Sequence, residues 1–210
     1  MKDLFQRRNR KMADNKKVKF GASNFEYGVV DKDDLVQETR KVPGLSTIKI
    51  ELTNEMKTLA ADDGPYVVLS GGITDAKETI EIYDVDSQMK VDFYGIKLVG
   101  GVEVFKKNLT PRDVATLFRT KLSNGQFVWV AMLKGKFTIP GVDTKTVDGT
   151  PDPNADSIEG SFVPRGDEDE GVILLIGRED NEGFNLEQFR KWVFPKTEEE
   201  GEIPDETPKP

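Results

Sequence analysis

The sequence predicts a mainly β fold, a β-sandwich or barrel with one or two short helices. Several short runs of the 210-residue chain alternate apolar and polar residues or are rich in β-forming residues. Asn124-Gly125, a pair favoured in tight hairpin turns, separates two such runs. Stretches with helical periodicity are few. Short strands divided by turn signals are typical of a sandwich or a barrel.

The predicted strands occupy most of the chain. The stretch Lys16–Val30 holds two apolar-alternating runs that are broken at Gly21. In Leu45–Leu52 the alternation places Ile48, Ile50 and Leu52 on one face. Further strands are predicted at Pro65–Ser70, Thr79–Val85, Gly101–Phe105, Val114–Leu133 (a hairpin), Ser157–Val163 and Gly171–Ile176.

The second strand of the hairpin is apolar on both faces. Phe127, Trp129 and Ala131 share one face, and the intervening residues Val128, Val130 and Met132 share the other. Such a strand is either buried on both sides by its own chain or buried on one side and packed against a neighbouring subunit on the other. Phe127, Trp129 and Val130 are therefore the candidate residues of a subunit interface.

Two short helices are predicted. Asp86 is a suitable N-cap for a helix that Gly95 would end. Asn185 is the expected N-cap of the second helix, and Pro195 stops it. The apolar stripe of this second helix is formed by Leu186, Phe189, Trp192 and Val193.

Charge divides the chain into three parts. Residues 1–20 hold eight Lys or Arg against two Asp, whereas the remaining residues hold 22 basic against 36 acidic side chains, a net charge of -14. Residues 196–210 carry a net charge of -4 and three Pro. We therefore expect a flexible basic arm at 1–16, with Met12 as an alternative start, a β-domain at 17–195, and a disordered acidic tail at 196–210.

The composition excludes several kinds of chemistry. The chain has no Cys and no His, so it cannot form disulfides, Ser-His-Asp sites or Cys-His sites within itself. Its glycines match no nucleotide-binding pattern, and Asp152–Ser157 lacks the glycine and the glutamate of a calcium loop. We expect no enzyme activity, no cofactor and no metal. A hydrolase with paired carboxylates, such as Asp62-Asp63 or Asp84 and Asp86, is an alternative.

The remaining acidic block and the overall charge bear on partners. Asp167, Glu168, Asp169 and Glu170 are interpreted as a solvated acidic surface, with divalent-cation binding or repulsion of DNA as alternatives. The acidic body argues against tight binding to nucleic acid. No apolar run approaches the about 18 residues that span a bilayer, so no membrane insertion is expected.

Five stretches, taken in order, resemble the major tail proteins of long-tailed phages of Gram-positive bacteria, which build the tail tube. The first reads KKVKFG-x-x-N-x-x-Y, and the last is the FNLEQFRKWVFP segment, which resembles the closing helix of the family. The resemblance covers most of Lys16 to Pro195, and its segments are Lys16–Tyr27, Lys41–Leu52, Leu59–Ile82, Phe118–Gly141 and Phe184–Pro195. The N-terminal leader and the acidic tail lie outside the pattern.

The resemblance implies a structural virion protein with a β-sandwich or barrel of the phage tail tube type. Such proteins form hexameric rings that stack into a tube, whose lumen holds the tape measure protein and later conducts DNA without sequence-specific binding. Tail tip and terminator proteins are the other implied partners. The implied location is the phage tail, after storage in the host cytoplasm. By position, Thr53–Asp75 is expected to be an inter-ring loop, with Asp62, Asp63 and Tyr66 as its candidate contact residues, and the basic arm is expected to dock on an acidic surface of the next subunit.

Two classes of protein remain as alternatives to a phage tail tube. One is a carbohydrate- or protein-binding β-sandwich module, which needs an exposed aromatic platform. The chain has only four Tyr and two Trp, and most of them lie in apolar runs. The other is a tube subunit of a secretion-system type, which shares the same architecture.

Overall fold

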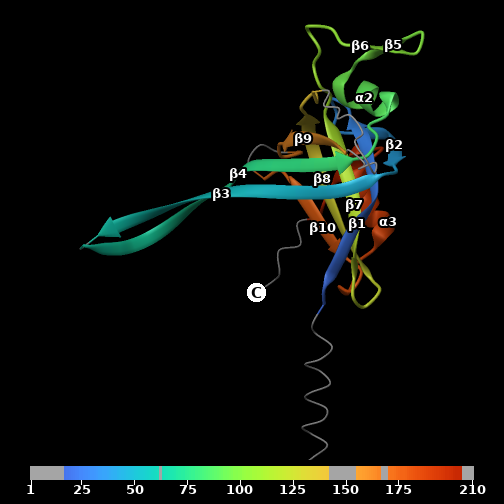
Figure 1. Ribbon diagram of the computed structural model, residues 1–210. Helices are drawn as coiled ribbons and strands as arrows, with labels where there is room; N and C mark the ends of the chain where they lie inside the picture. Colours follow the sequence, from blue (N-terminus) through green and yellow to red (C-terminus); the bar gives the residue numbers. More distant parts are fainter. Residues whose placement is uncertain (1–16, 62, 142–154, 167–169, 205–210) are drawn as a thin grey trace, which may run out of the picture.

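The computed structural model describes residues 17–61, 63–141, 155–166 and 170–204. It is built mainly from antiparallel strands with a few short helices, which confirms the predicted fold class (Figure 1). The strands are β1 (Lys19–Val30), β2 (Val36–Val42), β3 (Leu45–Ala61), β4 (Gly64–Ile82), β5 (Lys97–Val99), β6 (Val102–Val104), β7 (Val114–Leu122), β8 (Phe127–Phe137), β9 (Asp156–Phe162) and β10 (Leu174–Arg178). The helices are α2 (Ser87–Tyr94), α3 (Leu186–Val193) and α4 (Glu198–Gly201).

One large sheet forms the body. Its strands follow the order β2-β1-β7-β8-β9-β4-β3, and β10 pairs with β8 as well. The long strand β8 pairs with β7 and, in addition, with two other strands. It pairs with β10 along residues 128–132 and with β9 along residues 135–137, so the sheet branches at β8. The sheet then folds over itself, and β3 and β4 run across β1, β7 and β8 (Figure 1).

Two apolar cores lie on the two sides of β7 and β8. The first fills the space inside the folded sheet and is closed by α2, whose Phe93 stacks on Phe137 at 4.8 Å and meets Tyr27 edge-on. The second lies between the opposite face of β7 and β8 and helix α3, where Trp129 and Phe189 are buried. This arrangement explains why β8 is apolar on both faces.

Both predicted helices are confirmed, together with their caps. The Asp86 carboxylate accepts a hydrogen bond of 2.6 Å from the backbone N–H of Met89, and Gly95 ends α2 in the left-handed conformation at φ 68°. The Asn185 side chain accepts hydrogen bonds from the backbone N–H groups of Glu187 and Gln188 at 2.9 and 3.1 Å.

The chain beyond Pro195 continues to pack where a disordered tail was expected to begin. Helix α4 lies in this stretch, and Ile203 is partly buried against the second core. The Lys196 backbone N–H donates to the Glu200 carboxylate at 3.0 Å. The described part of the tail, up to Pro204, is therefore attached to the body, while the predicted division into three parts stays a prediction.

Candidate functional site

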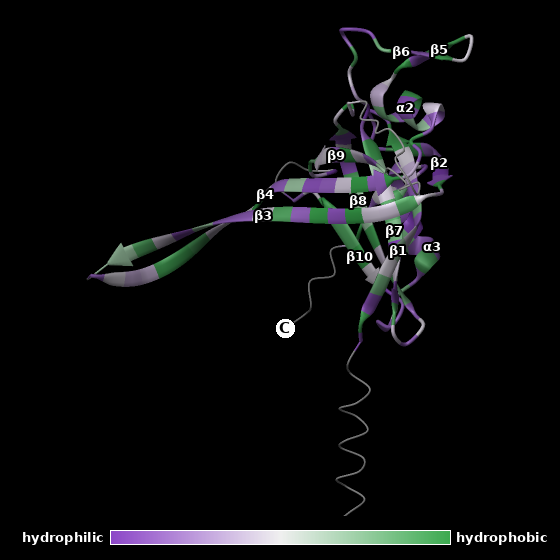
Figure 2. Cartoon of the chain, in the orientation of Figure 1, coloured by the Kyte–Doolittle hydropathy of each residue, from purple (hydrophilic) through white to green (hydrophobic). Residues whose placement is uncertain are grey.

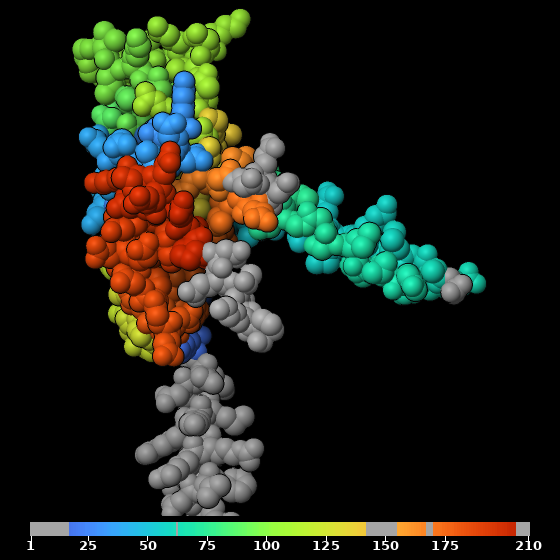
Figure 3. Space-filling view, turned by 180° about the vertical axis from the view of Figure 1, so that it is seen from behind, coloured from blue at the N-terminus to red at the C-terminus, as the bar shows by residue number. Residues whose placement is uncertain are grey.

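The most prominent feature is a two-stranded ribbon that extends away from the body, formed by residues 53–61 of β3 and 63–75 around the start of β4 (Figures 1 and 3). β4 pairs with β9 only from Lys77 onward, so within the described chain these residues of the ribbon pair only with each other. At about 3.3 Å per residue, Thr53 to Ala61 spans roughly 27 Å. The segment expected to be an inter-ring loop therefore forms two paired strands in its described part.

The described residues of the ribbon are solvent-exposed except Gly64, which is half-buried, and many of the exposed residues are apolar. Figure 2 shows hydrophobic stretches along both of its strands. Met56 is 71 %, Tyr66 77 % and Val68 58 % exposed. Other large exposed hydrophobic residues on the ribbon are Leu59, Val67, Leu69 and Ile73. Exposed apolar surface of this kind is typical of interaction sites.

The apolar residues lie on both faces of the ribbon. Met56 is paired with Ser70 and Thr58 with Val68, so these four side chains share one face. The neighbouring pair, Leu59 and Val67, lies on the other face. The ribbon therefore presents apolar surface on two sides, and an isolated hairpin of this kind is only marginally stable in water.

The ribbon contains local irregularities that change its twist. The pairing register shifts at Asn54 and again beside Leu59. Gly71 and Gly72 lie inside β4 opposite the first irregularity, and Gly72 has φ 74°. The Asn54 and Ser70 side chains are 3.2 Å apart across the strands and can hydrogen-bond.

The base of the ribbon is anchored in the first core. Ile80 and Ile82 of β4 are fully buried, and Ile48 and Ile50 of β3 pack against the same core. The Glu78 carboxylate is also fully buried here and accepts a hydrogen bond of 2.8 Å from the Thr116 hydroxyl. Burial raises the pKa of Glu78 to about 8, opposed by the smaller effect of the Thr116 hydrogen bond.

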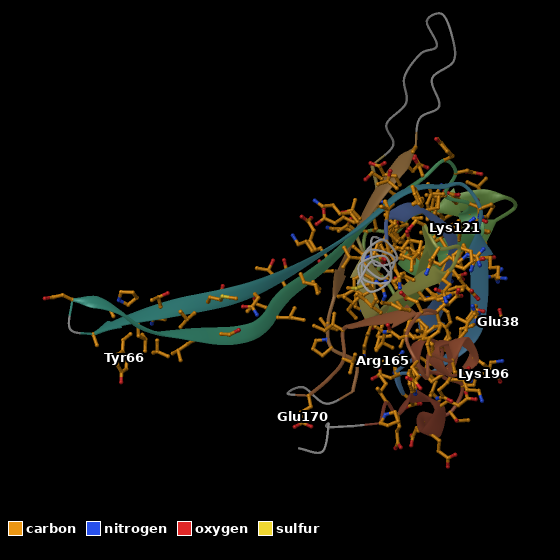
Figure 4. The ribbon with its side chains drawn as sticks, turned by 90° about the horizontal axis from the view of Figure 1, so that it is seen from below. Glu38, Tyr66, Lys121, Arg165, Glu170 and Lys196 are labelled. Carbon is orange, nitrogen blue, oxygen red and sulfur yellow. The ribbon has the colours of Figure 1, made fainter. Side chains whose placement is uncertain are left out.

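The predicted contact residues of the inter-ring loop fall on the ribbon where the structure describes them. Tyr66 lies far out on the ribbon, away from the body residues Glu38 and Lys121 (Figure 4). Asp63 is exposed at the tip, where its φ of 63° places it in the left-handed region. Asp62 lies outside the described residues. Their role in contacts between rings stays a prediction.

The candidate interface on β8 is corrected by the structure. Trp129 is 4 % and Val130 9 % exposed, and Phe127 is partly buried. The Trp129 indole N–H donates to the Glu179 carboxylate at 3.0 Å, inside the same subunit. Helix α3 covers one face of β8 and the folded sheet covers the other, so Trp129 and Val130 have no surface to offer a neighbour.

The predicted acidic surface is described only in part, because Asp167, Glu168 and Asp169 lie outside the described residues. Glu170 is exposed and borders a hollow of about 320 Å³ together with Asp34 and Glu202. The floor of this hollow includes Arg165, whose guanidinium donates to the backbone oxygens of Trp192 and Val193 at the end of α3 (Figure 4). Arg165 thereby fixes the end of the helix.

In the ranges given above, no group of three or more acidic side chains is placed to hold a metal ion. None of the helices described is long and apolar enough to cross a bilayer.

The fold resembles solved structures, whereas the sequence matches neither a family model nor a curated protein. Among solved structures, the fold is similar to a chain in the cryo-EM structure of an extracellular contractile injection system, the PVC sheath-tube complex in its extended state. The match has a TM-score of 0.40 and 9 % sequence identity, and it covers 74 % of this chain and 88 % of that chain.

Proposed function

We propose that the protein is a structural subunit that assembles with copies of itself into hexameric rings, stacked as the tail tube of a long-tailed phage. The order of the five sequence stretches that resemble major tail proteins supports this proposal. The mainly β body agrees with the fold that the resemblance implies. In this role the tube conducts DNA during ejection, and the subunit itself carries out no reaction.

The ribbon is the observation that carries the proposal. It exposes apolar side chains on two faces, and both of its outer strand edges are unpaired within the described chain. Exposed edges of this kind pair with other chains unless they are covered. Association of identical subunits covers such a surface on every copy, which is the requirement of a repeating tube.

The proposed partners follow from the tube. The tape measure protein fills the lumen before infection, tail tip and terminator proteins close the two ends, and DNA passes without sequence-specific contact. The chain has a net charge of -8, and an acidic wall repels phosphate. The proposed location is the virion, after a stage in the host cytoplasm.

The experiment compares the assembly of the native protein with that of a variant in which residues 54–73 are replaced by Asn-Gly. The variant should unfold at the temperature of the native protein, because none of the described residues that it removes belongs to either core. Negative-stain electron microscopy over a range of protein concentrations should show rings or tubes with a channel for the native protein and single subunits for the variant.

A milder variant tests the apolar surface of the ribbon and keeps its length. Met56→Thr, Tyr66→Thr and Val68→Thr together should also prevent assembly, whereas the matched control Thr58→Ser with Ser70→Thr should assemble normally. If the native protein stays monomeric even with tape measure and tip proteins added, the tube proposal fails and a binding module becomes the better interpretation.

A further inference from the structure

A second projection leaves the body near α2. It consists of the β5–β6 hairpin and the chain that follows, residues 97–112, and we call it the lobe (Figure 1). Its two strands pair only with each other within the described chain, through a turn at Gly100-Gly101. Like the ribbon, the lobe exposes large apolar side chains: Leu98, Val99, Val102 and Phe105 are 43 to 62 % exposed.

The lobe and the ribbon carry opposite charges. Residues 97–112 contain four basic side chains and one acidic, a net charge of +3 in a chain whose total is -8. Residues 53–75 contain four acidic side chains and one basic, a net charge of -3.

The basic side chains of the lobe are available for a partner. Its only acidic residue, Glu103, is already held by Lys90 at 3.1 Å and by the Ser87 hydroxyl at 2.6 Å. Lys106 and Lys107 are exposed and form no ion pair within the described residues.

The two projections of one subunit leave the body at different places and in different directions, as Figures 1 and 3 show from opposite sides. They therefore do not cover each other inside one copy. Each is an apolar surface without a partner within the described chain, and their charges are complementary. A second copy of the chain supplies the missing surface to both.

We propose that the ribbon of one copy docks on the lobe of a neighbouring copy. The apolar residues around Tyr66 and Val68 then cover Val99 and Val102, and the acidic tip at Asp63 faces Lys106 and Lys107. The contact joins two different surfaces, so the first copy keeps a free lobe and the second keeps a free ribbon for further copies. Such heterologous contacts generate rings or open filaments, and the inference thus rests on the proposed tube function.

The absence of cysteine from the chain allows a test by cross-linking without background. Two single-cysteine proteins, Tyr66→Cys and Val102→Cys, are mixed at a concentration at which the native protein assembles, and a short bis-maleimide is added. Mass spectrometry should find a covalent dimer that joins position 66 of one copy to position 102 of the other. In a matched mixture with Tyr83→Cys, an exposed position outside both projections, the dimer should be absent.

Charge reversal tests the complementarity. When the Val102→Cys copy also carries Lys106→Glu and Lys107→Glu, the yield of the 66–102 dimer should fall by about fivefold. This reduction corresponds to about 1 kcal/mol, which is the strength of exposed ion pairs. Adding Asp63→Lys to the Tyr66→Cys copy should restore much of the yield. Lys32→Glu, at an exposed lysine on the body, should leave the yield unchanged.

The outcomes separate this inference from the tube proposal. If rings or tubes form and the 66–102 dimer is absent, the ribbon docks elsewhere and the inference is overturned while the tube proposal stands. If the dimer forms and microscopy shows neither rings nor tubes, the contact is supported and the tube proposal fails. If neither is observed, both are rejected.

Discussion

Glu78 is an acidic side chain in the apolar interior, at the base of the ribbon. It pairs with Ile50 and Gly160 in the sheet, and its carboxylate receives one hydrogen bond, from Thr116. Its other oxygen, Oε1, has no hydrogen-bond partner within the described residues. Because its pKa is raised to about 8, Glu78 is protonated in the folded protein at neutral pH, which avoids burying a charge.

This raised pKa predicts a pH-dependent stability. Between the ordinary glutamate pKa of 4.5 and about 8, the unfolded chain ionises Glu78 while the folded chain does not, so the free energy of unfolding falls as pH rises. The loss is at most about 1.4 kcal/mol per pH unit. Glu78→Gln removes this contribution. Between pH 6 and pH 8, the free energy of unfolding measured with urea should therefore fall by about 2 kcal/mol less in the variant than in the native protein.

Urea unfolding of Glu78→Asp provides the control, because this variant keeps the ionisable group. Equal pH dependence of the native protein and Glu78→Gln would show that Glu78 is already ionised in the folded state. The comparison between variants cancels the contributions of other titrating groups.

At the scale of elements, helix α3 determines that one face of β8 is closed to other subunits. The helix covers the face of the sheet that holds Trp129, and a bidentate ion pair attaches it to β1. The Arg190 guanidinium donates to both Glu26 carboxylate oxygens, at 2.8 and 2.6 Å, and the Glu26 side chain is only 2 % exposed. Burial alone would raise the pKa of Glu26, but the Arg190 guanidinium holds it below the usual value.

Removing Arg190 should therefore destabilise the protein strongly. Arg190→Met leaves the Glu26 carboxylate buried without its partner, and we expect a loss of about 3 kcal/mol in the free energy of unfolding at pH 7. The double variant with Glu26→Gln should recover part of this loss. Chemical denaturation of the native protein, the two single variants and the double variant gives the coupling energy of the pair. If the effects of the two single substitutions simply add in the double variant, the ion pair does not have this role.

At the scale of the whole molecule, charge is distributed unevenly. The chain has a net charge of -8, yet residues 1–20 hold eight basic side chains against two acidic. In the proposed tube, like charges on the acidic bodies would oppose spontaneous stacking, and the proposal therefore includes a stored monomer. A basic segment can offset this repulsion where it meets the acidic surface of a neighbouring subunit.

Deleting residues 1–16 tests this part of the proposal. The deletion should leave the monomer folded, because both described cores are built from residues beyond Lys17. Tube growth, followed by light scattering and microscopy, should become slower and less extensive. A control with the basic residues of this segment kept and its other residues replaced by Ser should grow normally. Undiminished growth of the deletion variant would remove the arm from the assembly mechanism.

The sequence by itself determined much of the local structure, although β2 and the part of β3 beyond Leu52 were not predicted as strands. Alternation predicted the strands because side chains of a strand point to opposite faces, and Asp86, Gly95 and Asn185 predicted the helix ends because their side chains or backbone satisfy the terminal groups. The apolar character of both faces of β8 was also evident from sequence. Thr53–Asp75 was singled out from its position in the sequence as a contact segment, although it was expected to be a loop.

Only the tertiary structure decided which surfaces are free. Sequence alternation cannot distinguish burial by α3 from burial by another subunit, so Trp129 and Val130 were assigned to an interface that their own chain covers. The ribbon shows the reverse case. Met56, Tyr66 and Val68 are large and mostly apolar, but β9 pairs with β4 only from Lys77 onward, and no other described strand covers them. Exposure depends on which distant segments meet, and local patterns do not contain that information.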